Sequence, residues 1–150
     1  MHRIRRIFLS PAPNVPLMQA AYLLGMTFAE LKREIADGAI VAVSTRLGQR
    51  VPKEEMIAAA MRLWDQHAIE EALGDDAAAV LPEAIRLVEL RARVPRYQRD
   101  MLRFLAECEG TSVDAVLTRE LEGVASANAT ELAAALPGFA EALRWPAIHE

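Results

Sequence analysis

The chain has 150 residues, of which 53% are hydrophobic and 25% charged, so it can bury a core and its composition excludes a disordered chain. Only 5% of the residues are aromatic and alanine is abundant, which favours close-packed helices over a β-sandwich. The net charge is −4, and Cys108 is the single cysteine, so an intrachain disulfide is excluded and a reducing compartment is expected.

The charges are unevenly distributed along the chain. Residues 1–53 carry eight Lys and Arg against three Asp and Glu, and residues 86–103 carry six Arg against two acidic residues. Because phosphate contacts are local, two basic regions in an acidic chain are what a DNA-binding protein needs. Ordinary scatter of surface charge is the alternative interpretation.

Residues 1–16 are basic and contain three prolines. The apolar run 7–9 is shorter than the core of a signal peptide, and no run reaches the roughly 18 residues of a membrane-spanning helix, so we expect a cytoplasmic protein without membrane contact. We interpret residues 1–16 as a basic arm that inserts into a minor groove, or as a β-like segment that packs Ile4, Ile7 and Phe8 on the domain.

Residues 17–38 predict two short helices joined by a turn. Apolar residues at helical spacing indicate the first helix: Leu17, Ala20, Ala21 and Leu24. Gly25 is a turn residue, and Thr27 with Glu30 three residues later has the pattern of a capping box at the start of the second helix. Gly38 is a natural cap for the C-terminus of that helix.

A small β-hairpin is predicted next. Residues 40–43 are β-prone, residues 46–50 form a turn with basic flanks, and Val51-Pro52 leads back. Helix, turn, helix and hairpin together are typical of a winged helix-turn-helix. The stretch resembles the DNA-binding domain of the excisionase and MerR-like families in its turn, its helix ending in glycine and its basic wing. The matching residues are Leu24-Gly25-Met26-Thr27, Ile35-Ala36-Asp37-Gly38, and Arg46 to Pro52.

This resemblance implies that the second helix, residues 28–37, enters the major groove and that the hairpin acts as a wing. The candidate DNA-binding residues of this domain are Thr27, Phe28, Lys32, Arg33, Arg46, Gln49 and Arg50. The first turn of the helix offers Phe28, Ala29 and Glu30 to base edges, where the families usually place polar or basic groups. The better-equipped wing arginines suit phosphate or minor-groove contacts. A helix-turn-helix that serves packing alone is the alternative.

Residues 53–73 predict one helix, with Glu54 and Glu55 in its first turn where the helix dipole favours acidic groups. Its apolar residues follow one face. Gly74-Asp75-Asp76 then breaks the chain, and we place the domain boundary there, with a linker over residues 74–86.

A second pattern begins at Val88. Residues 88–94 alternate between apolar and charged side chains, with Val88, Leu90, Ala92 and Val94 on one face and Glu89, Arg91 and Arg93 on the other. After Pro95 a helix is predicted over 96–109, and Gly110 ends it. Thr111 or Ser112 caps a further helix.

This strand, helix, turn and helix resemble a ribbon-helix-helix repressor domain, covering about residues 87–125. The resemblance implies that two chains pair their strands, that Arg91 and Arg93 touch bases, and that Thr111 and Ser112 hold a phosphate. A competing interpretation is local. Residues 83–93 also fit one helical face, which would leave the arginines on a solvated surface.

The C-terminal segment, residues 126–150, predicts a helix over Ala129 to Leu136 and a short helix over Phe139 to Arg144. The break between them is Pro137-Gly138. Its apolar residues, with Phe139, Leu143 and Trp145 the largest, either dock on the protein's own core or bind a partner.

Together these patterns predict a mainly α protein with an N-terminal winged helix-turn-helix and a C-terminal helical dimerisation domain. The predicted parts are a basic arm (1–16), the winged helix-turn-helix (17–73), a linker (74–86), the ribbon-helix-helix-like domain (87–125) and an apolar tail (126–150). The expected function is a homodimeric regulator of transcription that binds double-stranded DNA. The alternatives are an antitoxin whose C-terminal segment binds a toxin, and a helical adaptor. We expect neither an enzyme nor a metal or cofactor site, because no catalytic grouping, phosphate loop or metal-ligand spacing occurs.

Overall fold

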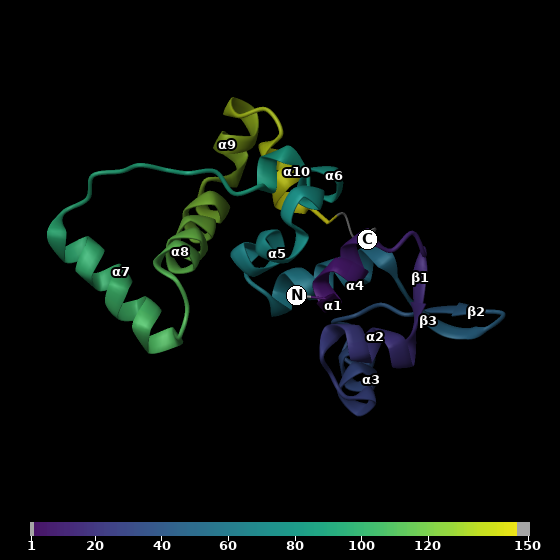
Figure 1. Ribbon diagram of the computed structural model, residues 1–150. Helices are drawn as coiled ribbons and strands as arrows, with labels where there is room; N and C mark the ends of the chain where they lie inside the picture. The colour runs from purple at the N-terminus through teal and green to yellow at the C-terminus, as the bar shows by residue number, and fades with distance from the viewer. Residues whose placement is uncertain (1, 147–150) are drawn as a thin grey trace. The chain divides into compact units, whose positions relative to one another are not determined.

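The computed structural model describes residues 2–146 (Figure 1). These residues are mainly helical and include a three-stranded antiparallel sheet, which confirms the predicted mainly α class. The chain divides into two compact units. Within the described residues, the first unit contains 2–83 together with 144–146, and the second contains 84–143. No helix in the described part is both long and apolar enough to cross a membrane.

The chain begins with an amphipathic helix, α1 (His2–Leu9), in place of the predicted arm or β-like segment. Ile4, Ile7 and Phe8 are buried, as the second interpretation expected, but in a helix. Their spacing of three and four residues places them on one helical face, so a helix buries all three at once while its arginines stay exposed. Only the last part of the predicted arm is extended, as strand β1 (Asn14–Pro16).

Two helices follow as predicted, α2 (Leu17–Leu24) and α3 (Phe28–Ala36). Gly25 ends α2 in the left-handed conformation, with φ of +73°, which a glycine adopts without strain. Asp37 is the C-cap of α3, and Gly38 follows with φ of +76°, so the predicted capping glycine lies one residue past the cap.

The predicted hairpin consists of β2 (Val43–Thr45) and β3 (Gly48–Pro52), and β1 completes the sheet in the order β1-β3-β2. The β-prone run 40–43 enters the sheet only at Val43, because Ile40 is instead buried in the core. Val15 lies opposite Val51 in the antiparallel pairing, and both are buried. The hairpin is therefore fixed to the core through β3.

The single helix predicted over residues 53–73 is wrong. The structure has two helices, α4 (Lys53–Leu63) and α5 (Gln66–Leu73), separated by Trp64 in an extended conformation. The Asp65 side chain accepts the backbone N–H of Ala68 at 2.8 Å, which starts a new helix where the apolar pattern alone continued the old one.

The predicted linker is also wrong over much of its length. Residues 74–80 form a short 3-10 turn, η1 (Gly74–Asp76), and helix α6 (Ala77–Val80), and Ala77 and Leu81 are buried. The Arg5 guanidinium donates to the Leu73 carbonyl at 2.8 Å and pairs with Asp76. These contacts hold the segment on α1, so the first unit extends to residue 83.

In the second unit, the turn η2 (Glu83–Ile85) leads into residues 86–95, which form neither helix nor strand within the described chain. The helical alternative for residues 83–93 is therefore wrong beyond Ile85. Helix α7 (Arg96–Glu109) has the predicted bounds, Gly110 caps it with φ of +64°, and α8 (Val113–Ala127) follows. The last two helices lie close to their predicted positions: α9 (Ala129–Ala135) and α10 (Phe139–Arg144).

Candidate nucleic-acid interface

The N-terminus of α3 is closed by the predicted capping box. The Thr27 hydroxyl accepts the backbone N–H of Glu30 at 3.2 Å, and the Glu30 carboxylate accepts the backbone N–H of Thr27 at 2.7 Å. The second bond favours the ionised carboxylate and lowers the pKa of Glu30 below its usual value. Glu30 is therefore committed to the cap, and the Thr27 hydroxyl is engaged there as well.

The exposed face of α3 presents the predicted residues Phe28, Lys32 and Arg33. The Lys32 ammonium lies 5.0 Å from the centre of the Phe28 ring, so these two side chains form one cation–π pair. This pair covers the first turns of the helix with an apolar ring and a positive charge. Arg33 is exposed one residue further on.

Helix α1 contributes a further exposed basic residue, Arg3, which the sequence interpretation did not name as a candidate. The Arg3 guanidinium lies 4.9 Å from the centre of the exposed Tyr22 ring at the end of α2. It also lies against Gly25, where an added Cβ would come within 2.9 Å of its Nη1 atom. The signal in the sequence was the apolar spacing of α1, which makes residues 2–9 a helix and directs Arg3 away from the core.

The β2–β3 hairpin carries the other basic candidates of the first unit. Arg46 and Gln49 are exposed, and Arg50 is half-buried and donates to Asn14 Oδ1 of β1 at 3.3 Å. Between Asp37 and Glu54 the chain contains no acidic residue. The hairpin therefore has only positive charges, whereas α3 has charges of both signs.

The loop from α3 to the hairpin is held by α4. Glu55 is 5% exposed, and its carboxylate accepts the backbone N–H of Val41 at 3.1 Å. Arg62 donates to the Ala39 carbonyl at 2.7 Å. A buried carboxylate without a hydrogen-bond donor would be costly, so the Val41 N–H and the Glu55 carboxylate depend on each other. The hairpin is thus positioned from both ends, by β1 and by α4.

The remaining predicted residues belong to the second unit. Arg91 and Arg93 are exposed, and Arg91 pairs with Glu89 at 3.1 Å. Ser112 is the cap of α8, since its hydroxyl accepts the backbone N–H of Ala115 at 3.1 Å. The exposed Thr111 lies just before it. The structure therefore gives Ser112 a structural partner and leaves the two arginines on the surface.

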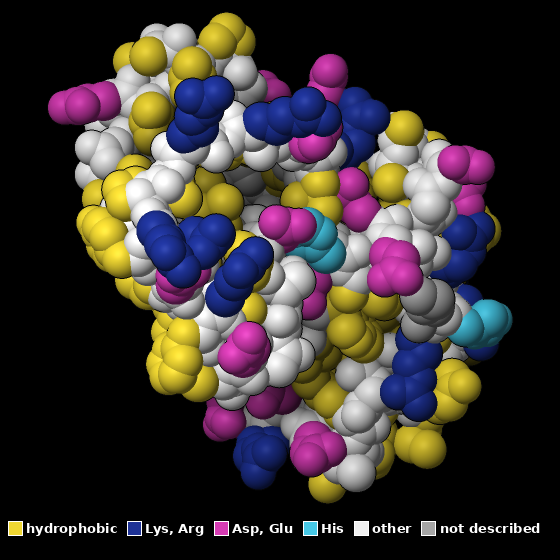
Figure 2. Space-filling model, turned by 60° about the vertical axis from the view of Figure 1, so that its left-hand side comes forward, with side chains coloured by type: hydrophobic (Ala, Val, Ile, Leu, Met, Phe, Trp, Pro, Cys, Tyr) yellow, Lys and Arg dark blue, Asp and Glu magenta, His cyan; other side chains and the backbone are white. Residues whose placement is uncertain are grey.

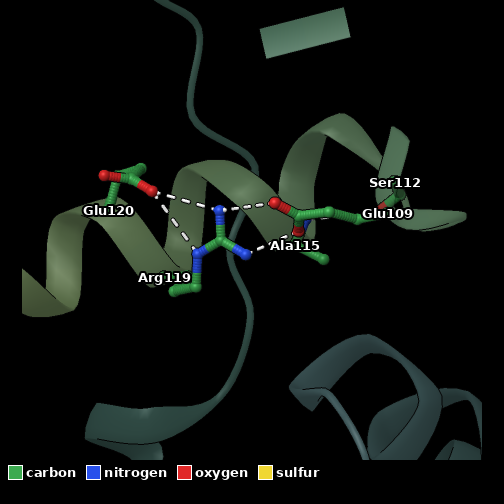
Figure 3. Close-up of polar contacts among 5 residues, drawn as sticks. All are labelled: Glu109, Ser112, Ala115, Arg119 and Glu120. Atoms are coloured by element: carbon green, nitrogen blue, oxygen red, sulfur yellow. Dashed lines mark hydrogen bonds and ion pairs between the residues drawn. The ribbon is translucent and has the colours of Figure 1, made fainter. Parts of the chain in front are cut away.

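An ion-pair cluster joins the two long helices of the second unit (Figure 3). Arg119 of α8 contacts both carboxylate oxygens of Glu109 at the end of α7, at 2.5 and 3.1 Å, and also Glu120 at 3.2 Å. The hydrogen bond from Arg119 lowers the pKa of Glu109, and the bond to Glu109 raises the pKa of Arg119. The cluster bridges α7 and α8 across the turn that separates them, and the sequence interpretation did not anticipate it.

A cavity of about 430 Å³ lies within the first unit, between α1, β1 and α2. Its lining includes the exposed Arg6 and the apolar Leu9 and Leu23, together with Asn14, which also accepts the bond from Arg50. The Arg5 guanidinium is engaged with carbonyls at the end of α5. Among the described residues there is no cluster of three or more His, Cys, Asp or Glu that could hold a metal ion.

Comparisons of the chain with protein-family profiles, with curated proteins and with solved structures found no match. The two family resemblances therefore rest on the residues quoted for them.

Proposed function

We propose that this chain is a homodimeric regulator of transcription that binds double-stranded DNA through a winged helix-turn-helix in its first unit. The observation that carries the proposal is the acid-free hairpin, which presents Arg46 and Gln49 to solvent in the same unit as α3. For a wing that follows the phosphate backbone, each positive charge raises the affinity for DNA and each carboxylate lowers it. The absence of Asp and Glu over residues 38–53 matches that requirement.

In this proposal α3 enters the major groove. Phe28 is positioned to contact a thymine methyl group, and Lys32 and Arg33 to contact phosphates. Glu30 does not read bases, because its carboxylate is held by the capping box. Helix α3 then fits the major groove and contributes positive charge, and the hairpin contributes much of the affinity for DNA.

The second unit supplies the dimer in this proposal. The backbone of Val88–Val94 makes no hydrogen bond within the described part of the chain, and the Val88 side chain is 85% exposed. Unpaired backbone groups beside apolar side chains suit addition of a strand from a second copy. Such a ribbon would place Arg91 and Arg93 together on its other face, where they would form a second contact with DNA.

The test is the binding of the full chain to a fluorescently labelled random-sequence duplex of about 30 base pairs. Between about 50 and 200 mM salt, the logarithm of the affinity should fall linearly with the logarithm of the salt concentration, with a slope of about 0.9 for each phosphate neutralised. A duplex that is not bound even at the lowest salt, by a chain shown to be folded, would refute the proposal.

Exposed apolar side chains on α7 favour a second candidate, an antitoxin that covers a toxin. Tyr97, Met101 and Phe104 are all exposed in the single chain. Light scattering on the purified chain separates the candidates. A mass of two chains that is unchanged by a co-expressed neighbouring protein supports the regulator, and a larger complex formed with that protein supports the antitoxin.

A further inference from the structure

The tip of the β2–β3 hairpin displays an apolar side chain on a rigid turn. Leu47 is 80% exposed. The Thr45 hydroxyl accepts the backbone N–H of Leu47 at 3.2 Å and donates to the Gly48 carbonyl at 2.8 Å. Gly48 has φ of +99°, a conformation that favours glycine. The turn is therefore held by Thr45 and Gly48, and not by packing of Leu47.

The geometry of this turn does not require a leucine at position 47. Tips of hairpins favour Asn, Asp, Gly and Ser, whose side chains are polar or whose backbone is permissive. The bonds that hold Leu47 in place use only its backbone N–H, so its side chain is free to serve something outside the chain. On one side it is flanked by the exposed Arg46, and no carboxylate occurs in the hairpin.

We propose that Leu47 is an apolar wedge that enters the minor groove of DNA and partly separates two stacked base pairs, with Arg46 held at the groove edge. This inference rests on the proposed function. Leucine is among the side chains that kink duplexes in this way, and Arg favours the negative potential of a narrow minor groove. Pyrimidine–purine steps unstack most easily, so the wedge selects sites that contain TA or CA at the position of the tip.

The test uses the full chain and duplexes with 2-aminopurine at successive positions of a site selected by the protein from a random library. The fluorescence of 2-aminopurine rises where its stacking is disrupted. The wild-type chain should raise the fluorescence at one step and bend the duplex in an end-to-end energy-transfer measurement. Leu47→Ala should abolish both signals and weaken binding about tenfold, while Leu47→Met should retain them.

Leu63→Ala is the matched control, since Leu63 is an exposed leucine of the same unit on α4. It should leave binding, fluorescence and bending unchanged. If the wild-type chain binds its selected duplex with no rise at any step, or if Leu47→Ala retains the rise, the wedge is refuted while DNA binding stands. If no duplex is bound at all, the proposed function fails, and the wedge fails with it.

Discussion

The two units of the chain differ in how much apolar surface they bury. The first unit encloses large side chains completely, among them Phe8, Leu31, Ile40, Met56 and Ile69. In the described part of the second unit, Ala106 and Val116 are the only buried hydrophobic residues, and neither side chain is larger than valine. The first unit therefore has a core of its own, whereas a unit of about 60 residues with so small a core needs a further surface to cover it.

The side chains that a partner would cover lie on one continuous stretch of sequence. Val88 and Leu90 are exposed before α7, and Tyr97, Met101 and Phe104 are exposed on it. Figure 2 shows hydrophobic side chains at the surface next to Lys and Arg. Such a surface in an isolated chain indicates a protein interface. The first unit thus has a core of its own, and the exposed apolar side chains of the second unit fit the association that is proposed for it.

The largest expected effect is on the free energy of unfolding, when one phenylalanine of each unit is replaced by alanine. Phe8→Ala removes a completely buried ring from the first unit and should lower the free energy of unfolding by about 3–5 kcal/mol. Phe104→Ala removes an exposed ring and should change it by less than about 0.5 kcal/mol in dilute solution. Urea unfolding followed by far-ultraviolet circular dichroism measures both, because both units are helical. Equal losses of stability in the two variants would contradict the difference in burial between the two units.

The second effect concerns association. Leu90→Asp places a charge among the apolar residues that are proposed to pair with a second copy, and should weaken dimerisation at least about 100-fold. Sedimentation equilibrium over a range of concentrations measures this constant. Leu63→Asp introduces the same charge at an exposed leucine of the first unit and should leave the constant unchanged. Dimers of unaltered strength in the Leu90 variant would place the interface elsewhere.

A smaller effect is expected where α4 holds the loop before the hairpin. Glu55→Ala leaves the Val41 N–H without its acceptor and should destabilise the first unit by about 1–3 kcal/mol. Glu55→Gln keeps an acceptor oxygen and should cost less. Chemical denaturation of the two variants tests this order, which would be overturned if the alanine variant were as stable as the wild type.

The smallest effect is a pH dependence at the capping box. Because the folded state lowers the pKa of Glu30, the carboxylate contributes stability above its unfolded pKa, and this contribution is lost as the pH falls through the lower folded value. The wild type should therefore lose more stability between about pH 6 and 3 than Glu30→Gln, which has no titrating group there. Parallel stability curves would show that the bond to Thr27 does not select the ionised form.

Local patterns predicted the local structure well. The capping box of Thr27 and Glu30, the left-handed caps Gly25 and Gly110, and the bounds of α7 all depend on residues within one or two turns. Arg33 and Arg46 were predicted as DNA-contacting residues, and the structure shows that both are exposed, as such a contact would require.

Distant contacts account for what the sequence did not reveal. The Arg5 guanidinium meets carbonyls of α5, 67 and 68 residues away, and this contact brings the predicted linker into the first unit. Arg3 lies over Tyr22 only once α1 has packed on α2. The alternation from Val88 to Val94 fitted a strand or a helix, because the conformation of such a segment depends on its hydrogen-bonding partners. Within the described residues of the single chain, its backbone has no such partner.

The salt dependence of DNA affinity in one charge variant tests the central claim most directly. If the hairpin contacts phosphates, Arg46→Gln should reduce the slope of log affinity against log salt by about 1. Arg6→Gln is the control, because Arg6 is exposed on α1 and has no hydrogen bond or ion pair among the described residues, and it should leave the slope unchanged. A slope that is the same for the wild type and Arg46→Gln would contradict a DNA-binding hairpin.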